Sequence, residues 1–158
     1  MTTTLFKIGL AALALAACFF ITSCSREDSS FTPRKIAMLE DKIGKDTVSN
    51  LQNSKNILTL QIKPDGKNDF STIEEATLSN DVSNRLKELL LEDDSYIFDR
   101  TKSCLFLPTE GWRFKGKEDV VVLYSSYCKQ IKITTLKKNF ILDIDPVNED
   151  FKALSNKN

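Results

Sequence analysis

The chain of 158 residues contains no histidine, and this limits the chemistry that the sequence can support. Without an imidazole, neither a Ser-His-Asp nor a Cys-His arrangement can form, and the commonest protein ligand of transition metals is missing. A serine beside a lysine, or a pair of carboxylates, could still catalyse a hydrolysis. Ser125 and Ser126 precede Lys129 and fit the first arrangement, but serines on a strand near a disulfide are more often structural.

Two groups of carboxylates have plainer structural interpretations. The run Glu92-Asp93-Asp94 is typical of a solvated helix end. We expect Asp143, Asp145, Glu149 and Asp150 to lie at the start of a C-terminal helix, where the helix dipole favours negative charge. Calcium is an alternative for this second group, but the glycine and the regular oxygen spacing of an EF-hand loop are missing. We therefore expect no metal and no cofactor.

The N-terminal residues up to Cys24 carry the most informative pattern. Lys7 is followed by an uncharged apolar stretch over residues 8–20 and by the small-residue approach Ile21-Thr22-Ser23. This pattern resembles a bacterial lipoprotein signal, which implies a signal peptide over residues 1–23 and a palmitate-type lipid on Cys24. Two or three acyl chains are implied, because a single chain binds membranes only marginally.

Two alternatives to cleavage before Cys24 remain open. The segment Leu15-Ala16-Ala17-Cys18 also has lipobox spacing, and cleavage there would leave Phe19, Phe20 and Ile21 beside the lipid. The apolar stretch could instead stay as an uncleaved anchor, although it is short for a membrane span. A signal and an anchor both keep Lys7 inside and place the rest of the chain outside the cytoplasm.

Two further segments carry resemblances. Residues 25–29, Ser-Arg-Glu-Asp-Ser, resemble the export signal that follows the lipidated cysteine in surface lipoproteins of the Bacteroidota, which implies the outer membrane or cell surface. The segment from Tyr96 to Ile133 resembles small secreted bacterial proteins of unknown function. That pattern consists of Tyr96, Cys104, Phe106, Pro108, Gly111, Phe114 and Cys128. It supports the strand order and the cysteine pairing but implies no activity.

Cys104 and Cys128 lie among the strands that the sequence predicts. Outside the cytoplasm, two thiols on neighbouring strands should oxidise if their Cα atoms come within roughly 4.4 to 6.8 Å. We predict a disulfide between them, which closes a loop of about 25 residues and stabilises the fold by roughly 3 kcal/mol. A metal site is the weaker alternative, because CxxC spacing and histidine are both absent.

Charge is balanced in total but not along the chain. Lysine and arginine number 22, as do aspartate and glutamate, so bulk charge does not predict a nucleic-acid partner. Residues 65–99 hold ten acids and three bases, whereas residues 100–142 hold nine bases and three acids. One interpretation is an acidic helical half packed against a basic sheet half. The other is a basic face for an anionic glycan such as lipopolysaccharide.

Five residues are candidates for binding a glycan or a protein partner: Trp112, Arg113, Tyr124, Lys129 and Lys132. Trp112 is the only tryptophan, and on a strand it shares one face with Phe114 while Arg113 takes the other. Packing in the core is its expected role. If Trp112 were instead exposed beside Tyr124 and Tyr127, it would anchor a sugar ring or a protein surface.

Composition divides the chain after the signal. Residues 24–55 are rich in Ser, Asn, Asp and Lys, which is typical of a flexible tether, with a short helix between Thr32-Pro33 and Gly44. Residues 56–158 are expected to form one domain. It opens with a strand in which Leu58, Leu60 and Ile62 alternate with polar residues. Residues 71–78 fit either a helix with a Ser71/Glu74 capping box or an edge strand.

The rest of the sequence predicts an α+β fold. Ser79 can cap a helix with an apolar face that suits packing across a sheet. Six extended segments follow, at 96–98, 103–107, 111–114, 119–127, 130–134 and 139–142, and their short connections favour an antiparallel arrangement. We expect an antiparallel β-meander of about five to six strands, one main helix across one face, and a short C-terminal helix after Pro146.

These patterns predict a lipid-anchored protein of the cell envelope, at the outer membrane or cell surface, that binds a partner and is not an enzyme. The partner would be an envelope protein or an anionic glycan, in addition to the membrane that holds the anchor. An alternative is a subunit or an immunity-type inhibitor of an envelope complex. A Ser-Lys or carboxylate hydrolase is a further alternative.

Overall fold

The computed structural model of the chain describes residues 35–64 and 70–155. The helices in this part are α1 (Ala37–Ile43), α2 (Lys45–Asn53), α3 (Asn80–Leu90) and α4 (Asn148–Ser155), with short 3-10 turns η1 (Asp93–Ser95) and η2 (Asp145–Val147). The strands are β1 (Asn56–Pro64), β2 (Phe70–Thr77), β3 (Glu110–Lys115), β4 (Val120–Ser125), β5 (Gln130–Thr134) and β6 (Asn139–Asp143). The predicted signal peptide, Cys18, Cys24 and the predicted export signal lie outside the described residues.

One antiparallel sheet holds the six strands in the order β2-β1-β3-β4-β5-β6. β3 to β6 follow one another as a meander, and the β1–β2 hairpin joins the free side of β3. The register places Thr59 of β1 opposite Trp112 of β3, and Trp112 opposite Val122 of β4. The predicted α+β class and the antiparallel sheet are therefore confirmed.

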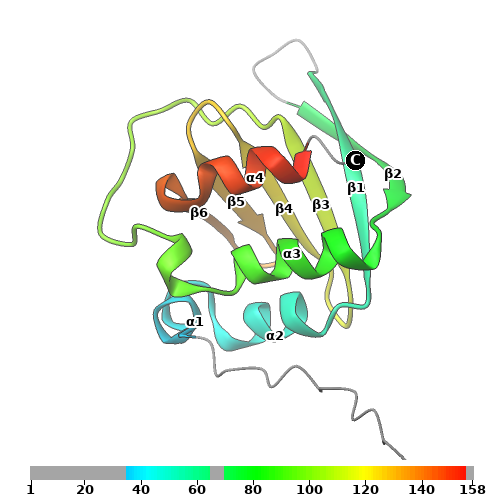
Figure 1. Ribbon diagram of the computed structural model, residues 1–158, viewed down its shortest axis with the longest axis horizontal. Helices are drawn as coiled ribbons and strands as arrows, with labels where there is room; N and C mark the ends of the chain where they lie inside the picture. The colour runs from blue at the N-terminus through cyan, green and yellow to red at the C-terminus, as the bar shows by residue number, and fades with distance from the viewer. Residues whose placement is uncertain (1–34, 65–69, 156–158) are drawn as a thin grey trace, which may run out of the picture. The chain divides into compact units, whose positions relative to one another are not determined.

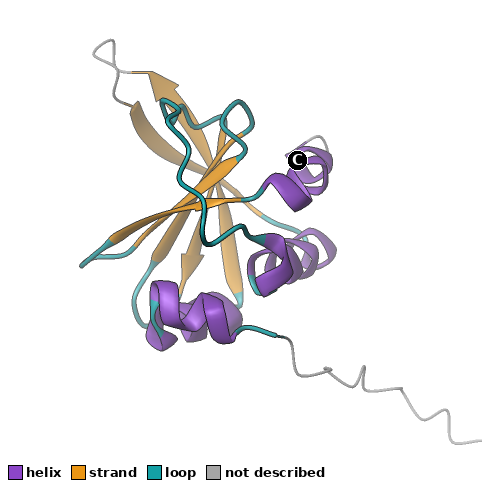
Figure 2. Ribbon diagram, turned by 90° about the vertical axis from the view of Figure 1, so that its left-hand side faces the viewer, coloured by secondary structure: helices purple, strands orange, loops and turns teal. Residues whose placement is uncertain are grey.

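The helices lie on one side of this sheet. Figure 1 shows α3 and α4 side by side in front of the strands, with α1 and α2 near one end, and Figure 2 shows the same layers turned by 90°. The sequence predicted one main helix over the sheet, whereas the described residues contain four α-helices, of which α3 is the longest with 11 residues. The predicted cap of α3 is present, because the Ser79 hydroxyl accepts the Val82 N–H at 3.4 Å.

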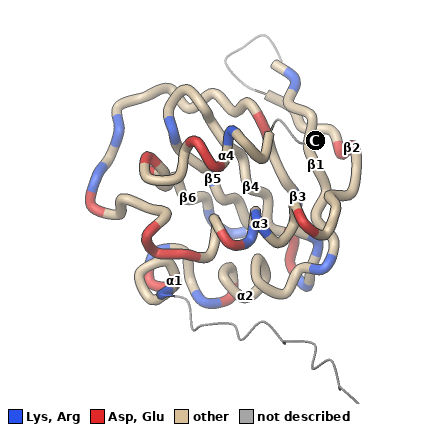
Figure 3. Tube along the Cα trace, in the orientation of Figure 1, with Lys and Arg blue, Asp and Glu red and all other residues tan. Residues whose placement is uncertain are grey.

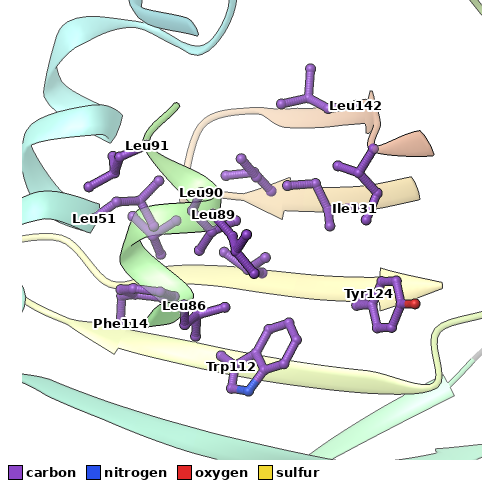
Figure 4. Packing of buried hydrophobic residues seen from close by; sticks show 14 of the residues in the cluster. Leu51, Leu86, Leu89, Leu90, Leu91, Trp112, Phe114, Tyr124, Ile131 and Leu142 are labelled. Carbon is purple, nitrogen blue, oxygen red and sulfur yellow. The ribbon is translucent and has the colours of Figure 1, made fainter. Parts of the chain in front are cut away.

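Large apolar side chains fill the layer between the sheet and the helices (Figure 4). Alternate residues of the central strands meet one face of α3, as the period of two in strands and the amphipathic pattern of helices require. Members of this core that are at most 4% exposed include Trp112, Phe114, Val122, Ile131, Ile133, Leu142, Leu86, Leu89, Leu90, Leu51 and Phe151.

The structure differs from the predicted tether over residues 35–55. Leu39, Ile43, Val48 and Leu51 recur at helical spacing in α1 and α2, and all four are buried in the same core. A segment that looks polar in composition therefore folds because its few apolar residues share one face. The packed domain begins before Ala37, not at residue 56.

Three segments with a predicted strand assignment have different outcomes in the structure. Residues 71–78 are a strand, β2, and not a helix over most of their length. Residues 96–98 and 103–107, predicted as strands, do not join the sheet; within the described chain, the only bridge that they make is between Ile97 and Asp143. The reason is a set of long-range contacts, because side chains of this segment pair with residues more than 40 positions away at the edge of the sheet.

Candidate functional site

Residues 99–109, which we call the strap, run without regular secondary structure from the edge of β6 to the start of β3. Just before the strap, the Ile97 N–H donates to the Asp143 carbonyl at 3.0 Å, and at its end the Thr109 N–H donates to the Tyr124 carbonyl at 2.8 Å. Figure 1 shows the strap as the long loop that passes outside β6 and over the β4–β5 turn. It therefore connects distant parts of the sheet.

A disulfide fastens the middle of the strap. Cys104 is bonded to Cys128 in the β4–β5 turn, with a Cα–Cα distance of 5.9 Å and 24 residues of separation. Cys128 is buried and Cys104 is partly exposed. The predicted pairing is confirmed, and the strap gains a covalent attachment to the scaffold.

Four charged side chains fasten the first part of the strap. Asp143, whose side chain is almost fully buried, accepts hydrogen bonds from Arg100 Nε at 2.7 Å and from the backbone N–H of Asp145 at 3.0 Å. Lys102 Nζ lies 2.8 Å from Asp143 Oδ1 and 2.7 Å from Asp145 Oδ1. Arg100 also pairs with Asp145. Two cations thus neutralise two carboxylates, and the strap is held at the edge of β6.

This network changes the acidity of Asp145. The hydrogen bond from Lys102 holds the pKa of the Asp145 carboxyl below its ordinary value, and Arg100 acts in the same direction. Lys102 also donates to the carbonyl of Cys128 at 3.1 Å. The same lysine therefore links the ion pairs to the turn that carries the disulfide.

Burial alternates along the strap and leaves an apolar patch outside. Cys104, Phe106 and Pro108 are partly buried, whereas Leu105 is 62% exposed and Leu107 is 47% exposed. Tyr127, next to Cys128, is 79% exposed, and the Leu105 carbonyl oxygen lies 3.0 Å from Cys128 Sγ. Leu105 and Tyr127 each neighbour one of the two bonded cysteines, and we call them, together with Leu107, the strap patch.

Known proteins give no further guidance to this patch. No protein-family model, curated protein or solved structure matches the chain. The functional interpretation therefore rests on the geometry of the residues themselves.

Trp112 and Tyr124, two of the predicted binding residues, belong to the core. Each is 1% exposed, and both rings contact Phe151 of α4, at centroid distances of 6.1 and 5.4 Å. The Tyr124 hydroxyl donates to Asn148 Oδ1 at 3.0 Å, and burial raises the pKa of Tyr124 to about 12. The expected core role of Trp112 is confirmed, and neither ring is placed to anchor a sugar or a protein.

The three predicted basic residues are not brought together with those rings. Because neighbouring residues of a strand point to opposite faces, Arg113 and Lys132 lie on the face of the sheet away from the helices. Arg113 Nε lies 2.9 Å from Glu74 Oε1. Lys129 is exposed in the β4–β5 turn with a left-handed φ of 51°, and it is the one member of the predicted set beside the strap patch.

Positive and negative side chains are interspersed along the described chain, as Figure 3 shows. Lys115 illustrates this, because its Nζ lies 3.1 Å from Glu74 and 3.3 Å from Asp119. These contacts raise the pKa of Lys115. Several cations of the basic segment 100–142 are therefore already paired with carboxylates.

Ser125, considered above for a Ser-Lys site, has a structural role. It is fully buried, and its hydroxyl accepts the Cys128 N–H at 3.4 Å, which closes the β4–β5 turn. Among residues 35–64 and 70–155, no group of three or more acidic or cysteine side chains could hold a metal ion. No helix in the same ranges is long and apolar enough to cross a bilayer.

Glu110 lies in a separate cleft between the β1–β2 hairpin and the ends of α3 and α4. The cleft has a volume of about 460 Å³ and is lined by Thr59, Glu75, Ala76, Thr77, Leu78, Ser79, Val82, Glu110 and Ser155. Burial raises the pKa of Glu110, and a hydrogen bond from Ser155 partly opposes this shift. Glycoside hydrolysis uses two carboxyl groups on opposite sides of one bond. Glu75, the other acid in the lining, is exposed, so the cleft offers one partly buried carboxyl, that of Glu110.

The sequence did not identify the strap patch. Residues 104–108 are apolar at every position, so no polar face indicates which side chains point outward. Asp143 and Asp145 were interpreted as helix-start charges, although their main contacts are to Arg100 and Lys102. The available signal was the placement of charges around the two cysteines. Two bases precede Cys104, and two acids follow Cys128.

Proposed function

We propose that this protein is a lipoprotein of the bacterial cell envelope, anchored at the outer membrane or cell surface through Cys24, that binds another envelope protein through the strap patch. The observation that carries the proposal is the exposure of Leu105, Leu107 and Tyr127 on a strap that is held by a disulfide and by ion pairs. Apolar and aromatic side chains on a rigid loop are typical of protein-binding surfaces.

The envelope location is supported by two features. The Cys104–Cys128 disulfide suits an oxidising compartment, because cytoplasmic thiols are kept reduced. The residues before Cys24 resemble a lipoprotein signal, with the export signal after it. The two features are independent, since one is a pattern in the first 29 residues and the other belongs to the folded domain.

A protein partner fits the strap patch better than an anionic glycan does. Two of its three members are leucines, which bind by burial of apolar surface and do not stack on sugar rings. The nearby cations Arg100 and Lys102 are occupied by Asp143 and Asp145, so they offer little free positive charge to a polyanion.

A photo-crosslinking residue placed in the intact, anchored protein tests this assignment. We would put p-benzoylphenylalanine at Tyr127 and, in a matched control, at Leu136, which is 85% exposed in the β5–β6 turn. Irradiation of cells should yield one discrete protein adduct from position 127 and none from position 136. Adducts of equal yield at both positions, or none at 127, would contradict the proposal.

Two substitutions separate a binding defect from a folding defect. Tyr127→Ser and Leu105→Ser remove exposed apolar surface and should leave the melting temperature unchanged, because neither side chain is in the core. Each should lower recovery of the partner in affinity purification of the intact protein about tenfold, as expected for residues at the centre of an interface. Unchanged recovery with both variants would exclude the strap patch as the binding surface.

A further inference from the structure

The sheet has two edge strands, β2 and β6, which differ in how far other segments cover them. At β6, the Ile97 N–H donates to the Asp143 carbonyl, and the strap follows directly, tied to Asp143 by Arg100 and Lys102. These contacts cover one end of a strand that is only five residues long. Short length and a covering segment are two devices by which proteins protect sheet edges.

Within the described residues, β2 lacks such protection. It runs for eight residues, contains neither proline nor lysine, and pairs with β1 alone. Its charge at Glu74 is compensated, because Arg113 and Lys115 both contact that carboxylate. The bulge in the β1–β2 pairing lies opposite Thr59, so the stretch from Phe70 to Glu74 stays regular.

The outward backbone groups of β2 follow from the register. The Leu78 N–H donates to the Ile57 carbonyl at 2.9 Å, which shows that odd-numbered residues of β1 direct their polar groups to β2. Gln61 and Lys63 are then bonded to Ile73 and Ser71, their partners in the register. Thr72 and Glu74 consequently direct their N–H and C=O groups away from the sheet.

We propose that two copies of this chain pair antiparallel through β2, centred on Ile73, so that one sheet continues across both. In this register Thr72 of each copy faces Glu74 of the other, and their outward groups exchange four backbone hydrogen bonds. Ile73, which is 45% exposed, meets Ile73 of the second copy in the closely spaced type of pair.

The side chains of β2 are self-complementary in this register. Glu75 faces Ser71 of the second copy, and Glu74 faces Thr72, so no two acids lie directly opposite each other. Each carboxylate therefore meets a hydroxyl, and the central contact is between two apolar side chains. This complementarity favours a second copy as the occupant of the edge. The inference does not depend on the strap patch, which belongs to other elements.

Oppositely charged substitutions at Ile73 test the proposed pairing of two copies. The side chain is 45% exposed and is not part of the buried core, so Ile73→Lys and Ile73→Glu should both fold with unchanged melting temperatures. By sedimentation velocity at micromolar concentration, the unsubstituted full chain should be a dimer and each variant alone a monomer. An equimolar mixture of the two variants should again be a dimer, because the introduced lysine of one chain then faces the introduced glutamate of the other. A monomeric unsubstituted chain, or variants that dimerise as strongly as it does, would overturn the proposal.

Disulfide trapping tests the register independently. The close pairing at Ile73 suits a disulfide, so Ile73→Cys should give a covalent dimer under mild oxidation. Ile141→Cys on β6 is the matched control, since Ile141 is 51% exposed on the opposite edge strand and the variant retains the same native cysteines. Equal trapping from both variants, or trapping of Thr72→Cys without that of Ile73→Cys, would overturn pairing centred on Ile73.

Discussion

The carboxylate of Asp93 accepts hydrogen bonds from the backbone N–H groups of Leu39 and Met38, at 2.9 and 3.1 Å, across more than 50 residues of sequence. Asp93 thus satisfies donors in the first turn of α1 that an isolated helix would leave open. Its own N–H donates to the Lys35 carbonyl at 2.8 Å. These three bonds fix α1 to the segment after α3 and explain why the packed domain includes residues that resemble a tether.

Removing this contact should destabilise the domain. Asp93→Ala leaves the Leu39 N–H buried without its acceptor, and we expect a loss of about 2 kcal/mol in the free energy of unfolding. Asp93→Asn should lose less, since one amide oxygen can still accept. Urea unfolding measures both, with the exposed neighbour Asp94→Ala as control. Equal stability of Asp93→Ala and Asp94→Ala would show that the contact does not fasten α1.

Gly111 of β3 should not tolerate a methyl group. A Cβ atom at this position would lie 2.8 Å from Leu123 Cδ2 and 3.2 Å from Leu60 Cβ, so both side chains would have to move. We expect Gly111→Ala to cost about 1–3 kcal/mol, as other overpacked sites do. At Gly116 the nearest atom would be 3.7 Å away, so Gly116→Ala should change stability by less than about 0.5 kcal/mol. Thermal unfolding of the two variants compares them directly, and equal melting temperatures would contradict the close packing.

The ion pairs of the strap predict a specific dependence on pH. Because the pKa of Asp145 is lower in the folded state than its ordinary value of 3.8, its contacts stabilise the fold above that value. The contribution is lost as the pH falls through the folded-state pKa. Asp145→Asn should therefore be less stable than the unsubstituted chain at neutral pH, and the difference should shrink in acid. Chemical unfolding over a pH series measures this, and a difference that stays constant with pH would refute it.

Local periodicity predicted much of the fold. The Ser79 cap, the apolar face of α3, four of the meander strands and the disulfide all depend on residues close in sequence or on simple cysteine chemistry. The sequence could not decide between strand and helix for residues 71–78, because Ser71 and Glu74 fit a capping box as well as β2. Pairing with β1 decides the outcome, and that is a tertiary contact.

Long-range contacts also explain what was missed. The strap resembles a strand in composition, but Arg100 and Lys102 find their carboxylates more than 40 residues away, on β6 and η2. Likewise, α1 is held by hydrogen bonds to Asp93, which follows α3 in the sequence. Neither the ion pairs of the strap nor the hydrogen bonds to Asp93 produce a periodic pattern in the sequence. The strap patch was missed for the same reason, since Leu105 and Tyr127 each neighbour one cysteine of a disulfide that joins residues 24 positions apart.

The most direct test of the proposed envelope function is intact mass spectrometry of the protein isolated from the membranes of the native cell without reduction. We predict a chain that begins at Cys24, carries two or three acyl chains, and has a Cys104–Cys128 disulfide. A full-length, unacylated chain with Cys104 and Cys128 reduced, recovered from the soluble interior of the cell, would contradict it.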